Sequence, residues 1–171
     1  MNIESEYDKQ LHRVATEFMG WEAEYPNDVF IHYSDPRDKE KLLPRLRLIK
    51  KDDYLYPKDI FNPSHFESQF EELLARIATL GWSFGYRIYH DFKTDNIQHL
   101  CTIFVKGSPA NTRVLSVSDA DEVGRPKGEL LISVICKALD LLKKWGVQIY
   151  FDPVEEKWTI IKPIQVNIEN E

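Results

Sequence analysis

A short basic segment flanked by glycines stands directly before the longest apolar stretch of the chain. It reads Gly124-Arg125-Pro126-Lys127-Gly128, and the residues after it repeat apolar side chains with the spacing of a helix face. A helix N-terminus presents unpaired N–H groups, and glycines let an anion approach the backbone. The segment is therefore a candidate phosphate site in which Arg125 and Lys127 supply charge. An ordinary loop with exposed cations is the alternative, because the spacing is not that of a Walker loop or a dinucleotide-binding fingerprint.

A second group of basic residues lies beside tyrosines in the first third of the chain. Its members are Arg45, Arg47, Lys50, Lys51, Tyr54 and Tyr56. Cations next to aromatic faces suit a phosphorylated ligand with a base to stack, although a run of charges is more commonly a solvated face. Trp21 and Tyr33 could add an aromatic wall to such a ligand site, and packing in the core is the alternative role for both.

Acidic residues and histidines near the expected strand ends could bind a metal or act as general bases. They are His90, Asp91, His99, Asp119, Asp121 and Glu122. Their spacing matches no known metal site, and Cys136 lies midway along an apolar helix, where a thiolate is disfavoured. We therefore expect no catalytic residues, no metal and no cofactor. A binding protein is favoured over an enzyme, and a nuclease or phosphoesterase ranks last.

Length and composition indicate one folded domain over residues 1–171. The chain has 171 residues, of which 43% are apolar, enough to form a buried core. Its 22 basic and 28 acidic residues give a net charge of -6, which argues against general nucleic-acid binding. Cys101 and Cys136 lie in apolar runs and are expected to be buried thiols in a reducing compartment. Because the first residues are polar and no apolar run could span a bilayer, we expect a cytoplasmic protein that is not membrane-bound.

Three helices are expected to position the candidate residues. The first covers 4–19 and stops before Gly20, which supplies the usual left-handed end. The second covers 62–80 and leaves Arg76 on its solvent face. The third covers 126–146 and has so little polar circumference that it should be packed on most sides.

The segments around these helices have the period of two that is typical of strands with one buried face. Short loops join the segments 82–89, 97–106 and 112–118. They predict an antiparallel meander, because crossover helices have no room. Two further segments at 147–151 and 157–161 predict a terminal hairpin. The proline-containing region 35–62 predicts an irregular insertion, within which 45–51 should form a short edge strand.

Four segments of the chain match, in order, the elements of one known family. They are the opening helix at 8–21 with its Met-Gly-Trp end, the Tyr-Ser motif at 33–36, the second helix at 63–81 and the closing helix LLISVICKALDLL at 130–142. In these segments the chain resembles the phage ABA-sandwich domain family, small bacteriophage and prophage proteins of largely unassigned activity. The resemblance implies an α+β fold, a three-layer α/β/α sandwich with about three helices around a mostly antiparallel meander. Its core would span 8–145, followed by a terminal hairpin and tail at 146–171.

The functional expectation combines the candidate sites with the phage context that the resemblance implies. We expect a non-enzymatic protein of the infected bacterial cytoplasm that binds a small phosphorylated ligand and sequesters a nucleotide immune signal. The ligand residues would be Gly124, Arg125, Lys127, Gly128, Arg45, Arg47, Trp21 and Tyr33. A homo-oligomer is expected because ligand sites in such small proteins are often shared between subunits. The alternative is a protein-interaction module that inhibits a host defence or assembly protein through its acidic surface.

Overall fold

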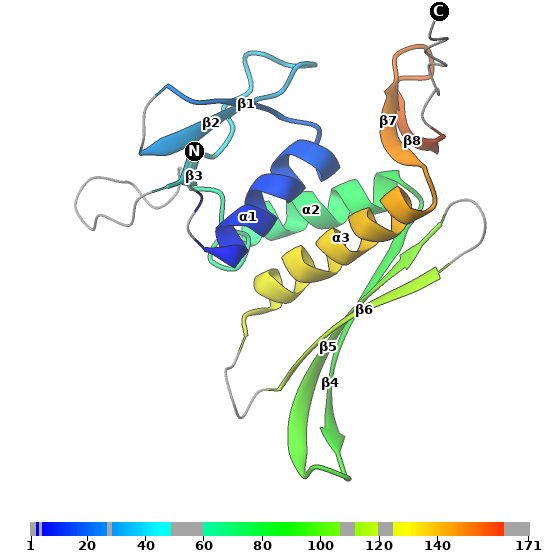
Figure 1. The fold of residues 1–171 in the computed structure, drawn as a ribbon. Helices are drawn as coiled ribbons and strands as arrows, with labels where there is room; N and C mark the ends of the chain where they lie inside the picture. Colours follow the sequence, from blue (N-terminus) through cyan, green and yellow to red (C-terminus); the bar gives the residue numbers. More distant parts are fainter. Residues whose placement is uncertain are drawn as a thin grey trace, which may run out of the picture.

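The computed structural model describes residues 3, 5–26, 29–48, 60–106, 112–119 and 125–162. Within them, helix α1 spans Glu6–Arg13 and continues into the π-helix η1, Val14–Phe18. Helix α2 spans Glu67–Thr79, and helix α3 spans Lys127–Lys144. The three helices lie together and run in roughly the same direction, so that all three begin at the same end of the molecule (Figure 1).

The strands form three small antiparallel sheets. The first sheet contains β1 (Glu22–Glu24), β2 (Phe30–Ser34) and β3 (Leu46–Arg47). The second contains β4 (Ser83–Asp91), β5 (Asn96–Val105) and β6 (Thr112–Asp119). The third contains β7 (Gln148–Asp152) and β8 (Lys157–Ile161). Every pairing between these strands is antiparallel. The predicted α+β fold, the meander and the terminal hairpin are therefore confirmed.

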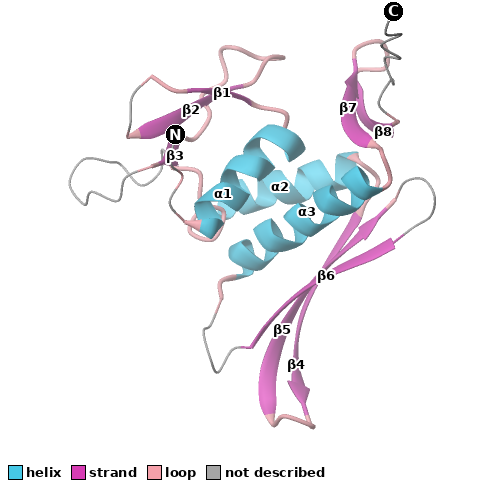
Figure 2. Ribbon diagram, in the orientation of Figure 1, coloured by secondary structure: helices cyan, strands magenta, loops and turns pink. Residues whose placement is uncertain are grey.

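The helices separate the first sheet from the meander of β4, β5 and β6 (Figure 2). Helix α1 contacts β3, whereas α3 packs on β5 and β6 and α2 contacts β4. Phe70 of α2 meets Phe84 of β4, and Lys127 of α3 lies over Tyr86 of the same strand, so α2 and α3 cover the same face of the meander. The helical layer that the family resemblance implies for the other face is not found among the described residues.

Helix α3 is the centre of the core, as its narrow polar stripe predicts. Fully buried apolar side chains lie on several sides of this helix: Leu130, Leu131, Ile132, Val134, Ile135 and Ala138. On the meander, Phe84 and Tyr86 lie opposite Ile103 and Cys101, which are also fully buried. Even so, no helix within the described residues has the length and apolar character needed to cross a membrane.

The first helix ends close to the predicted residue, but it does so through a π turn. The backbone N–H of Met19 donates to the Val14 carbonyl at 2.9 Å, which closes the wider π-helical ring. Gly20 then has a φ of 74°, and a Cβ there would lie 2.6 Å from Cη2 of Trp158. Glycine is therefore required both by the left-handed backbone and by the indole that covers it.

Helix α2 differs from the sequence prediction at its start and on one face. It begins at Glu67, because residue Asn62 instead organises a preceding turn in which its Oδ1 accepts the N–H of Ser64 at 3.3 Å. Arg76 was expected to face solvent, and this prediction is wrong, since the residue is only 5% exposed. Its guanidinium donates to a main-chain carbonyl of η1, a tertiary contact that helical periodicity does not reveal.

The predicted insertion at 35–62 is described only in part. Of the expected edge strand at 45–51, the structure describes residues 45–48, within which β3 covers Leu46–Arg47. Leu48 donates its backbone N–H to the Val29 carbonyl at 2.8 Å. The candidate residues Lys50, Lys51, Tyr54 and Tyr56 lie outside the described residues.

Candidate ligand-binding site

A cavity of about 530 Å³ lies where the helices begin, and we call it the helix-start cavity. Its walls come from the start of α1, strand β3, the segment 60–65 and the start of α3. The lining residues are Ser5, Tyr7, Asp8, Leu11, Leu46, Arg47, Ile60, Phe61, Asn62, Ser64, His65, Pro126 and Glu129. The cavity thus joins Arg47 to the start of α3, although the sequence separates these two candidate regions.

The starts of α1 and α3 bring helix N–H groups and acidic side chains together at this cavity. Ser5 caps α1, where its hydroxyl accepts the backbone N–H of Asp8 at 3.0 Å. The N-cap residues of α2 and α3, Phe66 and Pro126, make no side-chain capping hydrogen bond. Helix N-termini carry partial positive charge and N–H groups without an intrahelical partner. The starts of α1 and α3 line the cavity, so partial positive charge lies there beside the carboxylates of Asp8 and Glu129.

Among the described residues of the predicted basic groups, Arg47 is the one that lines the cavity. It pairs with Phe30 across β2 and β3, and its Nε is buried without a hydrogen-bond partner among the described residues. Arg45 is placed differently, because its guanidinium carbon lies 5.5 Å from the centroid of the Phe30 ring. Because the Arg47 side chain lines the cavity, its guanidinium charge would stabilise an anionic ligand there.

A network of neutral side chains holds the segment 60–65 against α1. Oδ1 of Asn62 accepts the hydroxyl of Tyr7 at 3.1 Å and that of Ser64 at 2.5 Å. Gln69 accepts the Asn62 N–H at 2.7 Å and donates to the Ile60 carbonyl at 2.7 Å. Burial raises the pKa of Tyr7 to about 12, so its hydroxyl stays protonated at neutral pH. These hydrogen bonds form a polar wall of the cavity.

Two carboxylates also line the helix-start cavity. Oδ2 of Asp8 accepts the hydroxyl of Ser5 at 2.6 Å. Oε2 of Glu129 lies 3.6 Å from Nε of Arg125, which holds that predicted ligand residue along the first turn of α3. Arg47 makes no ion pair with either carboxylate in the described part of the chain. Both signs of charge are therefore present in one cavity.

Lys127 points away from the helix-start cavity, toward aromatic rings of the core. Its Nζ lies 4.5 Å from the ring centroid of Phe70 and 5.6 Å from that of Tyr86. An ammonium over two aromatic faces is stabilised by their quadrupoles. The lysine was predicted as a phosphate ligand, but its described contacts are those of a packing residue.

Gly128 allows a close contact between two parts of the backbone. A Cβ at this position would lie 2.5 Å from the Pro63 carbonyl oxygen and 2.5 Å from the backbone N and Cα of Ser64. The space above this glycine is therefore filled by the segment before α2, rather than open to an anion. Gly124, the other predicted glycine, lies outside the described residues.

Trp21 and Tyr33 belong to the core and do not line the helix-start cavity. They are 4% and 7% exposed, and their ring centroids lie 5.8 Å apart. The Tyr33 hydroxyl hydrogen-bonds Nδ1 of His12 at 2.8 Å, and burial raises the tyrosine pKa. Of the two roles open for these residues, the structure supports packing.

The histidines that could serve an enzyme have local partners. Nε2 of His90 lies 2.9 Å from Asp95, and Nδ1 of His99 lies 2.5 Å from the hydroxyl of Tyr86. Within the described residues, no three His, Cys, Asp or Glu side chains are grouped so that they could hold a metal ion. The side chains of Asp119, Asp121 and Glu122 lie outside the described residues.

The two cysteines are buried thiols, as their apolar surroundings predict. Burial raises the pKa of both Cys101 and Cys136 to about 12. Because the thiolate is the reactive form, neither side chain is suited to nucleophilic catalysis at neutral pH.

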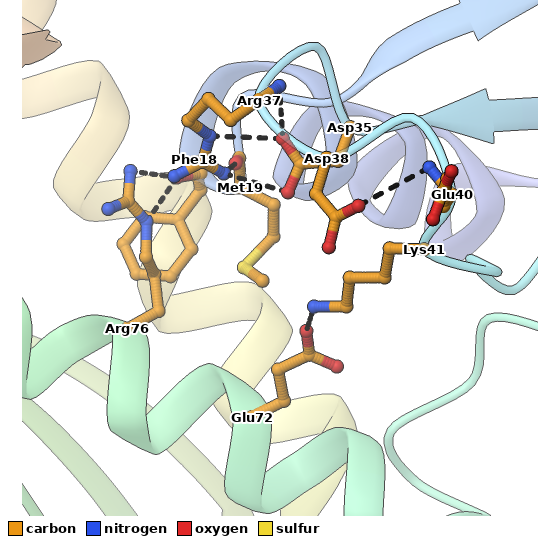
Figure 3. A network of polar contacts seen from close by, with 9 residues as sticks. All are labelled: Phe18, Met19, Asp35, Arg37, Asp38, Glu40, Lys41, Glu72 and Arg76. Atoms are coloured by element: carbon orange, nitrogen blue, oxygen red, sulfur yellow. Dashed lines mark hydrogen bonds and ion pairs between the residues drawn. The ribbon is translucent and has the colours of Figure 1, made fainter. Parts of the chain in front are cut away.

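Figure 3 shows a second polar cluster, at the end of η1. Nε and Nη2 of Arg76 donate to the Phe18 carbonyl at 3.0 and 2.9 Å. Nη2 of Arg37 lies 3.5 Å from the Met19 carbonyl and 3.2 Å from Oδ2 of the buried Asp35. The last carbonyls of a helix lack intrahelical partners and favour cations. The two arginines therefore stabilise the end of the first helix.

The same arginines attach the terminal hairpin to the core. The guanidinium carbons of Arg76 and Arg37 lie 3.3 and 4.4 Å from the ring centroid of Trp158 on β8. Burial, together with the neighbouring Arg37, lowers the pKa of Arg76 to about 9. These contacts explain the cluster as part of the fold, and it shares no lining residue with the helix-start cavity.

Sequence reasoning missed several residues of the helix-start cavity, above all Tyr7, Asp8, Asn62 and Glu129. Asn62 lies at the start of the predicted second helix, and Tyr7 lies within the predicted first helix, but neither was predicted as a site residue. Their proximity follows from packing between distant segments, for which the sequence carries no local signal.

In comparisons with protein-family models, curated proteins and solved structures, the chain has no match.

Proposed function

We propose that the protein binds a small phosphorylated ligand in the helix-start cavity and does not change it chemically. The observation that carries the proposal is the meeting of Arg47 with the starts of α1 and α3 around one cavity of about 530 Å³. A phosphate accepts several hydrogen bonds and carries the charge that helix starts and a guanidinium attract. The cavity volume also falls in the range of roughly 300–1,000 Å³ that is typical of small-molecule sites.

In its specific form, the proposal is a phage-encoded protein that sequesters a nucleotide immune signal in the bacterial cytoplasm, as a homo-oligomer. The family resemblance supports the phage origin. A single arginine in the cavity of a chain of net charge -6 supports a small anionic ligand over a nucleic-acid backbone. Sequestration requires binding without hydrolysis, and the high pKa of the buried thiols disfavours a cysteine-dependent hydrolase.

The test is to incubate the purified protein with a panel of cyclic and linear nucleotides, remove unbound ligand and release the remainder by heat. Unchanged nucleotide should be recovered from the wild type but not from Arg47→Gln. The variant Arg113→Gln is the matched control, since it removes an exposed arginine on β6 outside the cavity and should retain the ligand. Altered nucleotide would indicate an enzyme. No recovered nucleotide, or equal recovery from Arg47→Gln, would refute this site.

A second candidate function is a protein-interaction module that inhibits a host protein. The hairpin of β4 and β5 extends beyond the helices (Figure 2) and exposes Phe92, Ile88 and Ile97 by 89%, 57% and 46%. Exposed apolar side chains grouped on one element are typical of interaction sites. A defined host partner should bind the wild type and Arg47→Gln equally and lose affinity for Phe92→Ser. Equal binding by Phe92→Ser would exclude this hairpin as the interface.

A further inference from the structure

Charges of opposite sign line the helix-start cavity without neutralising one another. Arg47 lies on β3, whereas Asp8 and Glu129 lie in the first turns of α1 and α3. In the described residues, no ion pair joins Arg47 to either carboxylate. A bare phosphate would be attracted by the guanidinium and repelled by the two carboxylates. A simple anion is therefore not the ligand that complements this cavity.

The carboxylates retain capacity to accept hydrogen bonds. One oxygen of Asp8 accepts the Ser5 hydroxyl at 2.6 Å, and its other oxygen accepts none from the described residues. Glu129 has only the ion pair of 3.6 Å with Arg125 among the described residues, which is too long for a hydrogen bond. At least one oxygen on each side chain can therefore receive a donor from a ligand.

We propose that the ligand carries a sugar-type diol next to its phosphate, with the hydroxyls donating to Asp8 and Glu129. This inference rests on the proposed function and specifies its ligand class as ribose phosphates, including nucleotides. Carboxylates are the usual acceptors for ribose hydroxyls in nucleotide sites. The same carboxylates disfavour inorganic phosphate, which is abundant and lacks the diol. The cavity thereby selects the esterified ligand by attraction to its hydroxyls and by repulsion of the competitor.

The inference is tested by calorimetric titration with ribose 5-phosphate and with inorganic phosphate. The wild type should bind ribose 5-phosphate at least about tenfold more tightly, since hydrogen bonds to charged groups are among the stronger ones. The double variant Asp8→Asn and Glu129→Gln should lose this preference. Asp95→Asn is the matched control, because it removes a carboxylate that is 93% exposed at the hairpin turn, and it should keep the preference.

The outcomes separate this inference from the proposed function. If Arg47→Gln weakens both ligands and the double variant still prefers ribose 5-phosphate, the diol assignment fails and phosphate binding stands. Equal affinity of the wild type for the two ligands would likewise overturn the diol assignment alone. If the wild type binds neither ligand, or if Arg47→Gln changes neither affinity, the proposed function itself fails.

Discussion

Replacing Gly128 with alanine should destabilise the protein, although alanine is the better helix former. Intrinsic helix propensity would favour alanine by up to about 1 kcal/mol. In the structure, however, the new Cβ would lie 2.5 Å from three backbone atoms of Pro63 and Ser64. Backbone cannot swing aside as a flexible side chain can, and overpacking of this kind costs roughly 1–3 kcal/mol or more. With three contacts at once, we expect a net loss of about 2 kcal/mol.

Urea unfolding followed by tryptophan fluorescence measures this loss. With a slope of roughly 2 kcal/mol per molar urea, the midpoint should fall by about 1 M. Gly85→Ala is the matched control, because a Cβ at that strand position meets no atom within 4 Å. Its midpoint should stay unchanged or rise slightly. A Gly128→Ala protein as stable as the wild type would refute the close packing of α3 on the segment 60–65, and with it one wall of the helix-start cavity.

Two further predictions concern buried polar groups. Arg76→Ala should lower the unfolding free energy by about 3 kcal/mol, because the Phe18 carbonyl loses both of its donors and a cavity forms. A thermal midpoint equal to that of the control Arg113→Ala would contradict a stabilising role of Arg76. Burial raises the pKa of Cys101 and Cys136 from 9.0 to about 12, so the folded state binds more protons than the unfolded state between these values. Their contribution to stability is complete below pH 9.0 and is lost as the pH rises toward about 12, so the urea midpoint should fall over this range. A midpoint that rises there would contradict the burial of the thiols.

The helices and the meander were predictable because their signals are local. The apolar circumference of α3 and the alternation along β4 each follow from burial of one part of a regular element. Arg76 shows where such reasoning stops. Its position in α2 indicates a solvent-facing side chain. In the structure, however, its guanidinium donates a hydrogen bond to the carbonyl of Phe18, the last residue of the π-helix η1. A main-chain acceptor on another element leaves no mark on the periodicity of α2.

The candidate site was predictable only in pieces. Both the basic residue Arg47 and the start of α3 were recognised from residue type, and the structure places both at one cavity. Lys127 and Gly128 were chosen by the same reasoning, yet one contacts aromatic rings and the other contacts backbone. Side-chain direction and close backbone contacts depend on tertiary packing, so residue type near a helix start identifies the region without identifying which residues face the cavity.

The most direct test of the helix-start cavity is a calorimetric titration of the wild type, Arg47→Gln and Arg113→Gln with one phosphorylated ligand at two salt concentrations. We expect Arg113→Gln to bind as the wild type does. Because Arg47→Gln lacks a charged hydrogen-bond donor, its affinity for the ligand should be lower than that of the wild type by roughly tenfold or more. The affinity of the wild type should fall at the higher salt concentration. Equal affinities of all three proteins would contradict the binding of a phosphate at Arg47.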